Sequence, residues 1–223
     1  MALLPINTTH TMKYRIIPVT PYQQNCSLIW CQHTHHGALI DPGGEADRLL
    51  RAARTEGVQL QMLLLTHGHW DHVGAAQEIA EQLGIPIIGP HQEDAFWLER
   101  LPRQTEMLGF APLQAFIPDR WLTDGATVRL GKITLDVLHC PGHTPGHVVF
   151  FHAGSHTAFV GDVLFQGSIG RTDFPRGDHA ALIHSIMDKL LPLGDDITVI
   201  PGHGPHTTLG EERLHNPFLI KIK

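Results

Sequence analysis

The sequence lacks any run of about 18 apolar residues, so no segment is long enough to cross a membrane as a helix. It also lacks an excess of positive charge. Lysine and arginine number 16 against 22 aspartates and glutamates, and the net charge of −6 argues against binding to nucleic-acid phosphates. Because residues 1–11 contain neither a basic n-region nor an apolar h-segment, we expect no secretory signal.

Cysteine is scarce as well. The chain has three, Cys26, Cys31 and Cys140, an odd number without the spacing of a disulfide framework. This pattern favours a reducing, cytoplasmic location.

The length of 223 residues suits one domain with a sizeable core. No low-complexity block, charge run or solenoid repeat divides the chain. We therefore expect a single domain over residues 13–223, preceded by a flexible N-terminal extension over residues 1–12.

Strand-like and helix-like segments alternate along the chain, which predicts an α/β fold in layers. Residues 91–101 are compatible with a helix, and the rest of 90–125 reads as loop. The predicted strands span 14–19, 27–31, 38–40, 62–65, 86–88, 127–130, 134–139, 148–152, 157–160 and 197–200, and the predicted helices span 45–56, 73–83 and 179–191.

Histidine is the abundant residue: there are 18, more than the 16 lysines and arginines together. Four potential metal ligands, His67, His69, Asp71 and His72, fall within six residues directly after a predicted strand. A lone histidine is usually a surface or structural residue, but this density is not explained that way. In an extended segment His67, His69 and Asp71 would point to one side and His72 to another, so one loop would serve two neighbouring ions.

Three further candidate ligands follow later predicted strands. They are His143 in a Pro-Gly-His-Thr-Pro-Gly segment, Asp162 in Val-Gly-Asp and His203 in Pro-Gly-His-Gly. Flanking glycine and proline indicate fixed loops, which is where a rigid sheet presents functional groups.

With these residues the sequence resembles the metallo-β-lactamase superfamily and, within it, the short bacterial glyoxalase II-like hydrolases. The segment from Thr66 to Gly74, THGHWDHVG, carries most of the resemblance, and the match extends over nearly the whole chain. The resemblance implies a four-layer αββα sandwich with the site at one edge of two mixed sheets.

The same resemblance implies a ligand set for two divalent metal ions per chain. Zinc is the expected metal, and iron and manganese are compatible with a set of imidazoles and carboxylates. The pattern assigns His67, His69 and His143 to the first ion, Asp71, His72 and His203 to the second, and Asp162 to both.

Two metal ions that share a water make it a nucleophile near neutral pH, and a thiolate is a good leaving group. We therefore expect a thioesterase acting on S-lactoylglutathione or a related hydroxyacyl thioester, with Asp71 orienting the bridging water. Asp41 in an Asp-Pro-Gly-Gly turn is either a support behind the ligands or a turn former. Arg171 either contacts an anionic substrate or pairs with Asp173.

Two alternatives stay open. A persulfide dioxygenase would hold one iron with His67, His143 and Asp162, and a hydrolase of another ester, lactone or amide would use the full ligand set. We do not expect the helical C-terminal domain with which full-length glyoxalase II enzymes bind glutathione, because only 20 residues follow His203. A true β-lactamase is not expected, since the sequence encodes no export. The substrate partner is a small molecule, and oligomerisation is left open.

Overall fold

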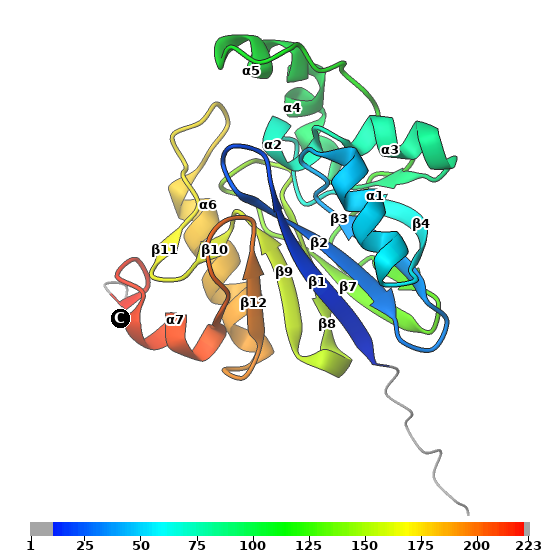
Figure 1. The fold of residues 1–223 in the computed structure, drawn as a ribbon. Coiled ribbons are helices and arrows are strands. Elements are labelled where there is room, and N and C mark those ends of the chain that lie inside the picture. The colour runs from blue at the N-terminus through cyan, green and yellow to red at the C-terminus, as the bar shows by residue number, and fades with distance from the viewer. Residues whose placement is uncertain (1–10, 221–223) are drawn as a thin grey trace, which may run out of the picture.

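The computed structural model describes residues 11–220 and contains two large β-sheets stacked face to face (Figure 1). The first sheet has the order β1 (Met12–Val19), β2 (Gln24–Cys31), β3 (His36–Ile40), β4 (Gln59–Leu64) and β5 (Ile87–Ile88). The second has the order β13 (Thr207–Thr208), β12 (Thr198–Pro201), β9 (Thr157–Gly161), β8 (Val148–His152), β7 (Ile133–His139) and β6 (Thr127–Leu130). A separate two-stranded ribbon joins β10 (Leu164–Phe165) and β11 (Ser168–Ile169).

Both large sheets are mixed, as the resemblance implied. In the first, β4 and β5 run parallel to β3 and the other pairs are antiparallel. In the second, only the β9–β12 pair is parallel.

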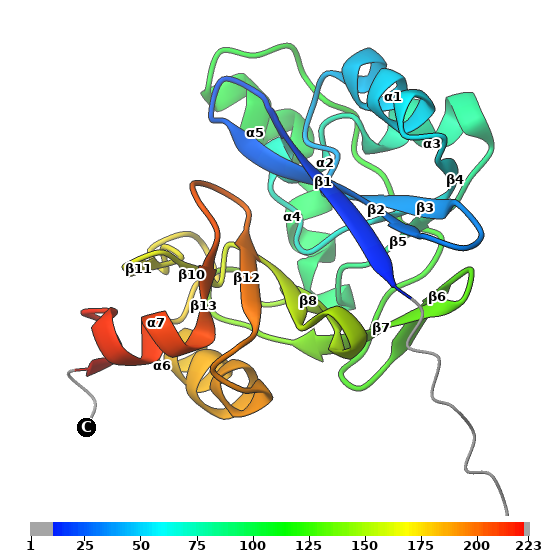
Figure 2. The same cartoon turned by 60° about the horizontal axis from the view of Figure 1, so that its bottom comes forward.

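Helices cover the outer faces of the two sheets, which gives four layers (Figure 2). The helices are α1 (Ala46–Thr55), α2 (Trp70–Val73), α3 (Ala76–Leu83), α4 (Ala95–Glu99), α5 (Leu101–Met107), α6 (His179–His184) and α7 (Leu209–His215), with a π-helical turn at Ser185–Leu190 after α6 and 3-10 turns at Gln92–Asp94, Ala153–Ser155 and Leu191–Leu193. No helix in the described part of the chain is long and apolar enough to span a membrane.

Three apolar cores separate these layers. Successive residues of β2 point to opposite faces, so Leu28 packs in the core under α1 and α3 while Ile29 packs between the sheets. In β8, Val149 faces the core under α6 and Phe150 faces the core between the sheets. Segments buried on both faces favour apolar side chains on both, which explains the hydrophobic run Val148–Phe150 of β8. The predicted αββα sandwich is confirmed.

Several boundaries differ from prediction. The helix predicted over 73–83 is split into α2 and α3, because the Ala75 N–H donates to the carbonyl of Pro42 (2.9 Å) and leaves the helical ladder. The segment 101–107, most of it predicted as loop, forms helix α5, and residues 209–215, for which no element was predicted, form helix α7. Strand β1 already begins at Met12, and residues 1–10 of the predicted flexible extension lie outside the described residues. The three cysteines are buried free thiols.

Candidate metal centre

Four of the predicted ligands lie between the end of β4 and the end of α2. His67 and His69 belong to the connection, whereas Asp71 and His72 lie in α2. Because α2 is helical, the expectation that Asp71 points with His67 and His69 is wrong. Asp71 and His72 gather with His203, while His67 and His69 gather with His143.

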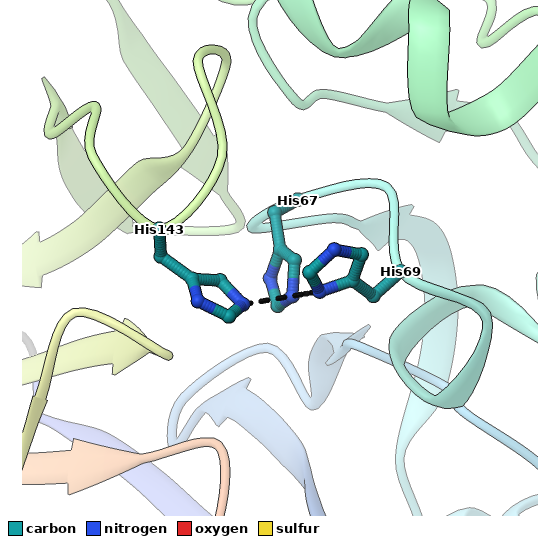
Figure 3. Close-up of side chains that lie close together, drawn as sticks. All are labelled: His67, His69 and His143. Atoms are coloured by element: carbon teal, nitrogen blue, oxygen red, sulfur yellow. Dashed lines mark hydrogen bonds between the residues drawn. The ribbon is translucent and has the colours of Figure 1, made fainter. Parts of the chain in front are cut away.

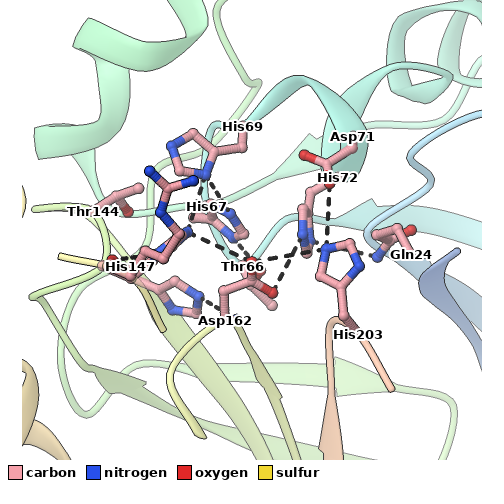
Figure 4. Close-up of polar contacts among 12 residues, drawn as sticks. Gln24, Thr66, His67, His69, Asp71, His72, Thr144, His147, Asp162 and His203 are labelled. Atoms are coloured by element: carbon pink, nitrogen blue, oxygen red, sulfur yellow. Dashed lines mark hydrogen bonds and ion pairs between the residues drawn. The ribbon is translucent and has the colours of Figure 1, made fainter. Parts of the chain in front are cut away.

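The other three ligands come from the second sheet and meet the first four at the edge between the sheets (Figure 3 and Figure 4). His143 lies between β7 and β8, Asp162 directly follows β9, and His203 follows β12. Asn25 of β2 fixes the last of these loops: its amide nitrogen donates to the carbonyls of Pro201 (3.0 Å) and Gly204 (2.8 Å). Asn25 is a supporting residue that the sequence did not indicate.

The first group consists of three buried imidazoles whose nitrogens converge on one point (Figure 3). His69 Nδ1 lies 3.1 Å from His67 Nε2 and 3.0 Å from His143 Nε2. His143 Nδ1 donates to the Arg171 carbonyl (2.7 Å), so in the neutral ring Nε2 carries no proton and presents its lone pair. His67 Nδ1 faces the Thr66 hydroxyl (3.0 Å), whose own proton goes to Asp41 (2.6 Å). His67 Nε2 is therefore unprotonated as well.

The protonation of this group follows from its surroundings. Burial, together with the neighbouring imidazoles, holds the pKa values of His67 and His69 well below their ordinary value. The pKa of His143 is lowered by burial too, although Asp162 opposes the shift. Neutral imidazoles that direct lone pairs at one another are unfavourable unless a cation lies between them.

The second group combines two imidazoles with the carboxylate of Asp71. His72 Nδ1 donates to Asp41 (2.9 Å) and His203 Nδ1 donates to the Tyr22 carbonyl (3.1 Å), so both rings turn Nε2 toward the carboxylates of the centre. His203 Nε2 lies 3.3 Å from an oxygen of Asp71. The side chains of Asp71 and His203 remain 14% and 28% exposed, so this is the open end of the centre.

Asp162 lies between the two groups. Its Oδ1 is 3.4 Å from His72 Nε2, and its Oδ2 is 3.6 Å from His143 Nε2 and 3.8 Å from His203 Nε2. Burial opposes ionisation of Asp162, but the facing imidazoles outweigh it and hold the pKa well below its ordinary value. At His72, where burial lowers the pKa, Asp162 and Asp71 outweigh it and raise the pKa.

Unpartnered buried atoms agree with metal binding at this centre. Asp162 Oδ1 and His72 Nε2 face each other, and neither has a hydrogen-bond partner. Buried polar atoms are rarely left unpaired, and a divalent cation satisfies a carboxylate oxygen and an imidazole lone pair together. The donors are nitrogen and oxygen, without a thiolate, so the residues fit two hard or borderline divalent ions.

Asp41 stands behind both groups at once. Its carboxylate accepts from His72 Nδ1, from the Thr66 hydroxyl and from the Thr66 backbone N–H (2.7 Å). Through Thr66 it fixes His67, and directly it fixes His72. Of the two interpretations that the sequence allowed for Asp41, this geometry favours the support behind the ligands.

Asp94 performs a comparable task and was not predicted. Its buried carboxylate accepts from the Gly68 N–H (2.8 Å), the Thr144 hydroxyl (2.8 Å) and the Gly146 N–H (2.6 Å). Gly68 lies between two ligands and Thr144 follows a third, so Asp94 ties the loops of the first group together. Burial raises the pKa of Asp94 to about 7, against the lowering effect of these hydrogen bonds.

His147 supports Asp162. Its ring stacks on that of His67, with centroids 4.7 Å apart, and its Nε2 accepts from the Asp162 backbone N–H (3.1 Å). Burial lowers its pKa well below the ordinary value, which keeps the accepting nitrogen free of a proton.

The guanidinium of Arg171 forms a bidentate pair with Asp173, with both N–O distances at 2.9 Å, and lies over the Phe174 ring. This is the pairing that the sequence left as one of two interpretations. A substrate contact by Arg171 stays a prediction, while its backbone carbonyl orients His143.

The sequence matches the description Metallo-beta-lactamase superfamily over residues 19–203. The protein named hydroxyacylglutathione hydrolase GloC from Haemophilus influenzae is 52% identical over 209 residues, which are 93% of this chain and 98% of that protein. The crystal structure of BLEG-1 B3 metallo-beta-lactamase has a TM-score of 0.86 at 38% identity, covering 93% of this chain and 99% of that one. The crystal structure of TTHA1623 in a di-iron-bound form has a TM-score of 0.83 at 40% identity, covering 92% of this chain and 100% of that one.

Proposed function

Since this chain belongs to the metallo-β-lactamase superfamily as a glyoxalase II-like, metal-dependent thioester hydrolase, we propose that it acts on S-lactoylglutathione or a related hydroxyacyl thioester. The observation that carries the proposal is the assembly of two groups of converging imidazole and carboxylate donors around one shared carboxylate, in a chain 52% identical to a hydroxyacylglutathione hydrolase.

We propose the following roles for the seven residues. Those of the first group hold one ion, those of the second group hold the other, and the carboxylate between them binds both. In that order they are His67, His69 and His143; Asp71, His72 and His203; and Asp162.

Ions bound at these positions would supply Lewis acidity, which polarises the thioester carbonyl and lowers the pKa of water toward neutrality. The carboxylate of Asp71, at the open end, accepts a hydrogen bond from the attacking water and so orients it. Trp97 and Phe174, with ring centroids 4.5 and 5.0 Å from that of His69, shield the opposite end from solvent. A thiol pKa of about 8.5 makes the thiolate a good leaving group without a separate general acid.

Zinc is the metal we propose, and the di-iron form of TTHA1623 supports a test of iron beside it. We further propose that residues 13–223 fold as one domain and that the enzyme works in the cytoplasm. The three unpaired cysteines support a reducing compartment.

Metal content is the first test. Protein purified without chelator should carry about two ions per chain, because two complete donor groups share one carboxylate. Elemental analysis that finds a single ion in fully active protein would contradict the binuclear assignment.

The second test separates hydrolysis from oxidation. Zinc-loaded protein should cleave S-lactoylglutathione anaerobically, because hydrolysis needs a Lewis acid and no change of electron count. His203→Ala should lose on the order of 100-fold or more in rate, since even supporting residues behind a metal ligand are worth about 10–100-fold. His206→Ala is the matched control, because His206 is exposed in the same loop.

Each alternative predicts a different outcome. A persulfide dioxygenase would consume oxygen with an iron-loaded site, show no anaerobic thioesterase activity and tolerate the loss of His203. The similarity to a B3 metallo-beta-lactamase makes a β-lactam the comparison substrate for amide hydrolysis, beside a simple ester and a lactone. Faster turnover of any of these than of the thioester would overturn the proposed substrate.

A further inference from the structure

Two arginines lie over one aromatic ring beside the metal centre. The guanidinium carbons of Arg100 and Arg176 are each 4.2 Å from the centroid of the Phe96 ring. Arg100 directly follows α4, which contains Phe96, and Arg176 lies in the loop between β11 and α6. Two segments distant in sequence thus bring two positive charges to the same ring.

Neither arginine is part of an ion pair with the residues that the structure describes. Among the described residues no carboxylate lies within 4.0 Å of either guanidinium, whereas neighbouring Arg171 is fully paired with Asp173. Both Arg100 and Arg176 are exposed. Two like charges near one ring repel each other, and the face of Phe96 offsets only part of that repulsion. An anion between or beside them would relieve it.

A continuous aromatic path leads from this ring to the metal centre. The Phe96 ring lies 5.5 Å from that of Trp97, and the Trp97 ring lies 4.5 Å from that of His69. Phe174 runs alongside, with its ring 6.2 Å from Trp97 and 5.7 Å from His143. These steps place the Phe96 ring within about 10 Å of a proposed metal ligand.

That separation matches the reach of an anionic thiol carrier. From the sulfur of a glutathione thioester, the cysteine–glycine arm ends in a carboxylate roughly 7–10 Å away, at about 3.5 Å per extended residue. A guanidinium presents a planar fork of N–H donors that fits a carboxylate in a bidentate manner.

We propose that Arg100 and Arg176, positioned on Phe96, bind the carboxylate of the thiol carrier while the acyl group reaches the metal centre. This inference rests on the proposed thioesterase function and adds a specificity site to it. Arg100 and Arg176 act on substrate binding, and the chemical step stays with the metal centre.

The test compares two substrates in the metal-loaded enzyme. Arg100→Gln and Arg176→Gln should each raise the KM for S-lactoylglutathione by about tenfold, the worth of one charge-assisted hydrogen bond, with kcat nearly unchanged. The KM for the neutral thioester S-lactoyl-N-acetylcysteamine should not change. Arg51→Gln is the matched control, because Arg51 is exposed on α1, on the outer face of the first sheet.

A binding measurement without turnover completes the test. In calorimetry, S-hexylglutathione should bind the wild-type enzyme and should bind the double variant Arg100→Gln/Arg176→Gln with lower affinity. The ester of S-hexylglutathione, in which the carboxylates are blocked, should bind weakly to both proteins. Phe96→Leu, which keeps both charges but removes the ring, should give an intermediate loss.

The outcomes separate the two proposals. If the wild-type enzyme hydrolyses both thioesters and the Arg100→Gln/Arg176→Gln variant has the same change in KM for both, or no change for either, the proposed carboxylate site is wrong. The proposed thioesterase function stands in that case. If the wild-type enzyme hydrolyses neither, the proposed function fails, and unchanged S-hexylglutathione affinity in the double variant would then also overturn the carboxylate site.

Discussion

Asp94 is a single residue on which the first ligand group depends, although it binds no metal itself. Three donors from two loops meet its buried carboxylate. Asp94→Ala would leave these donors unpaired in the interior. We expect a loss of roughly 3 kcal/mol in the free energy of unfolding and a metal affinity about 10–100-fold weaker. Urea denaturation and metal titration measure both quantities.

The control for this variant is Asp136→Ala, since Asp136 is exposed on β7. It should leave stability and metal affinity nearly unchanged. Equal effects of the two substitutions would mean that Asp94 does not hold the loops together.

The pH dependence of stability also reports on Asp94. Its pKa is about 7 in the fold and 3.8 in an ordinary exposed setting, so between these values the folded state holds more protons than the unfolded state. The stability contributed by Asp94 therefore falls as pH rises from about 4 to about 7. Thr144 keeps its hydrogen bond in either state, because a hydroxyl both donates and accepts.

Asp94→Asn cannot titrate, so we expect the stability advantage of the wild-type protein over this variant to be larger at pH 5 than at pH 8. Denaturant unfolding of metal-free protein at the two pH values gives the difference, in which the other titrating groups cancel. An equal advantage at the two pH values would show that Asp94 is charged in the fold throughout this range.

What the sequence predicts at this scale is the chemistry of the ligands and not their support. All seven predicted ligands come together in the structure. They could be predicted because loops bounded by glycine and proline, with fixed spacing between the ligands, form a local sequence pattern. Asp94 and Asn25 leave none. Their hydrogen bonds reach 26 to 179 residues along the chain, and nothing in the neighbouring sequence marks their partners.

At the scale of elements, the Asp-Pro-Gly-Gly turn and α2 pack backbone against backbone. A Cβ on Gly43 would overlap the carbonyl oxygen of Asp71, and a Cβ on Gly74 would overlap that of Gly43. Only glycine permits this approach, which carries α2 and its two ligands to the edge of the sheets.

Gly43→Ala should therefore displace α2 and weaken metal binding at the second group, in which Asp71 and His72 take part. Gly44→Ala is a matched control one residue away, since its Cβ would meet only the Thr20 methyl group at 3.2 Å. Metal titration should find that one of the two ions binds Gly43→Ala with lower affinity, and that both ions bind Gly44→Ala with the wild-type affinity. Equal affinities in both variants would contradict the role of this contact.

Elements with one strong periodicity were predicted well, and those defined by distant partners were not. Helix α1 was predicted because Leu49, Leu50 and Ala53 form one buried face. Helix α7 was missed although Thr208 and Glu211 have the spacing of an N-terminal cap, and the Thr208 hydroxyl does accept from the Glu211 N–H (3.2 Å). The break between α2 and α3 depends on Pro42, more than 30 residues away, and no local pattern contains it.

At the scale of the whole molecule, the metal centre joins two halves. The first sheet and its helices supply His67, His69, Asp71 and His72, and the second sheet supplies the other three ligands. The interface between the sheets is apolar, and at the edge where the ligands meet, backbone contacts such as Asn25 N–H to the Gly202 carbonyl (2.7 Å) cross it. Bound ions would cross-link the halves there only in the folded state.

Chelation should consequently lower the melting temperature in one cooperative transition, because a ligand that binds only the folded state stabilises it by mass action. Asp162→Ala should mimic this loss more strongly than His203→Ala. The carboxylate faces both donor groups, so its removal should release both ions, whereas loss of His203 leaves the first group complete. Calorimetry with parallel metal analysis distinguishes the variants. Unchanged melting after full demetallation would show that the sheets alone fix the centre, and one normally occupied ion in Asp162→Ala would show that the carboxylate is not shared.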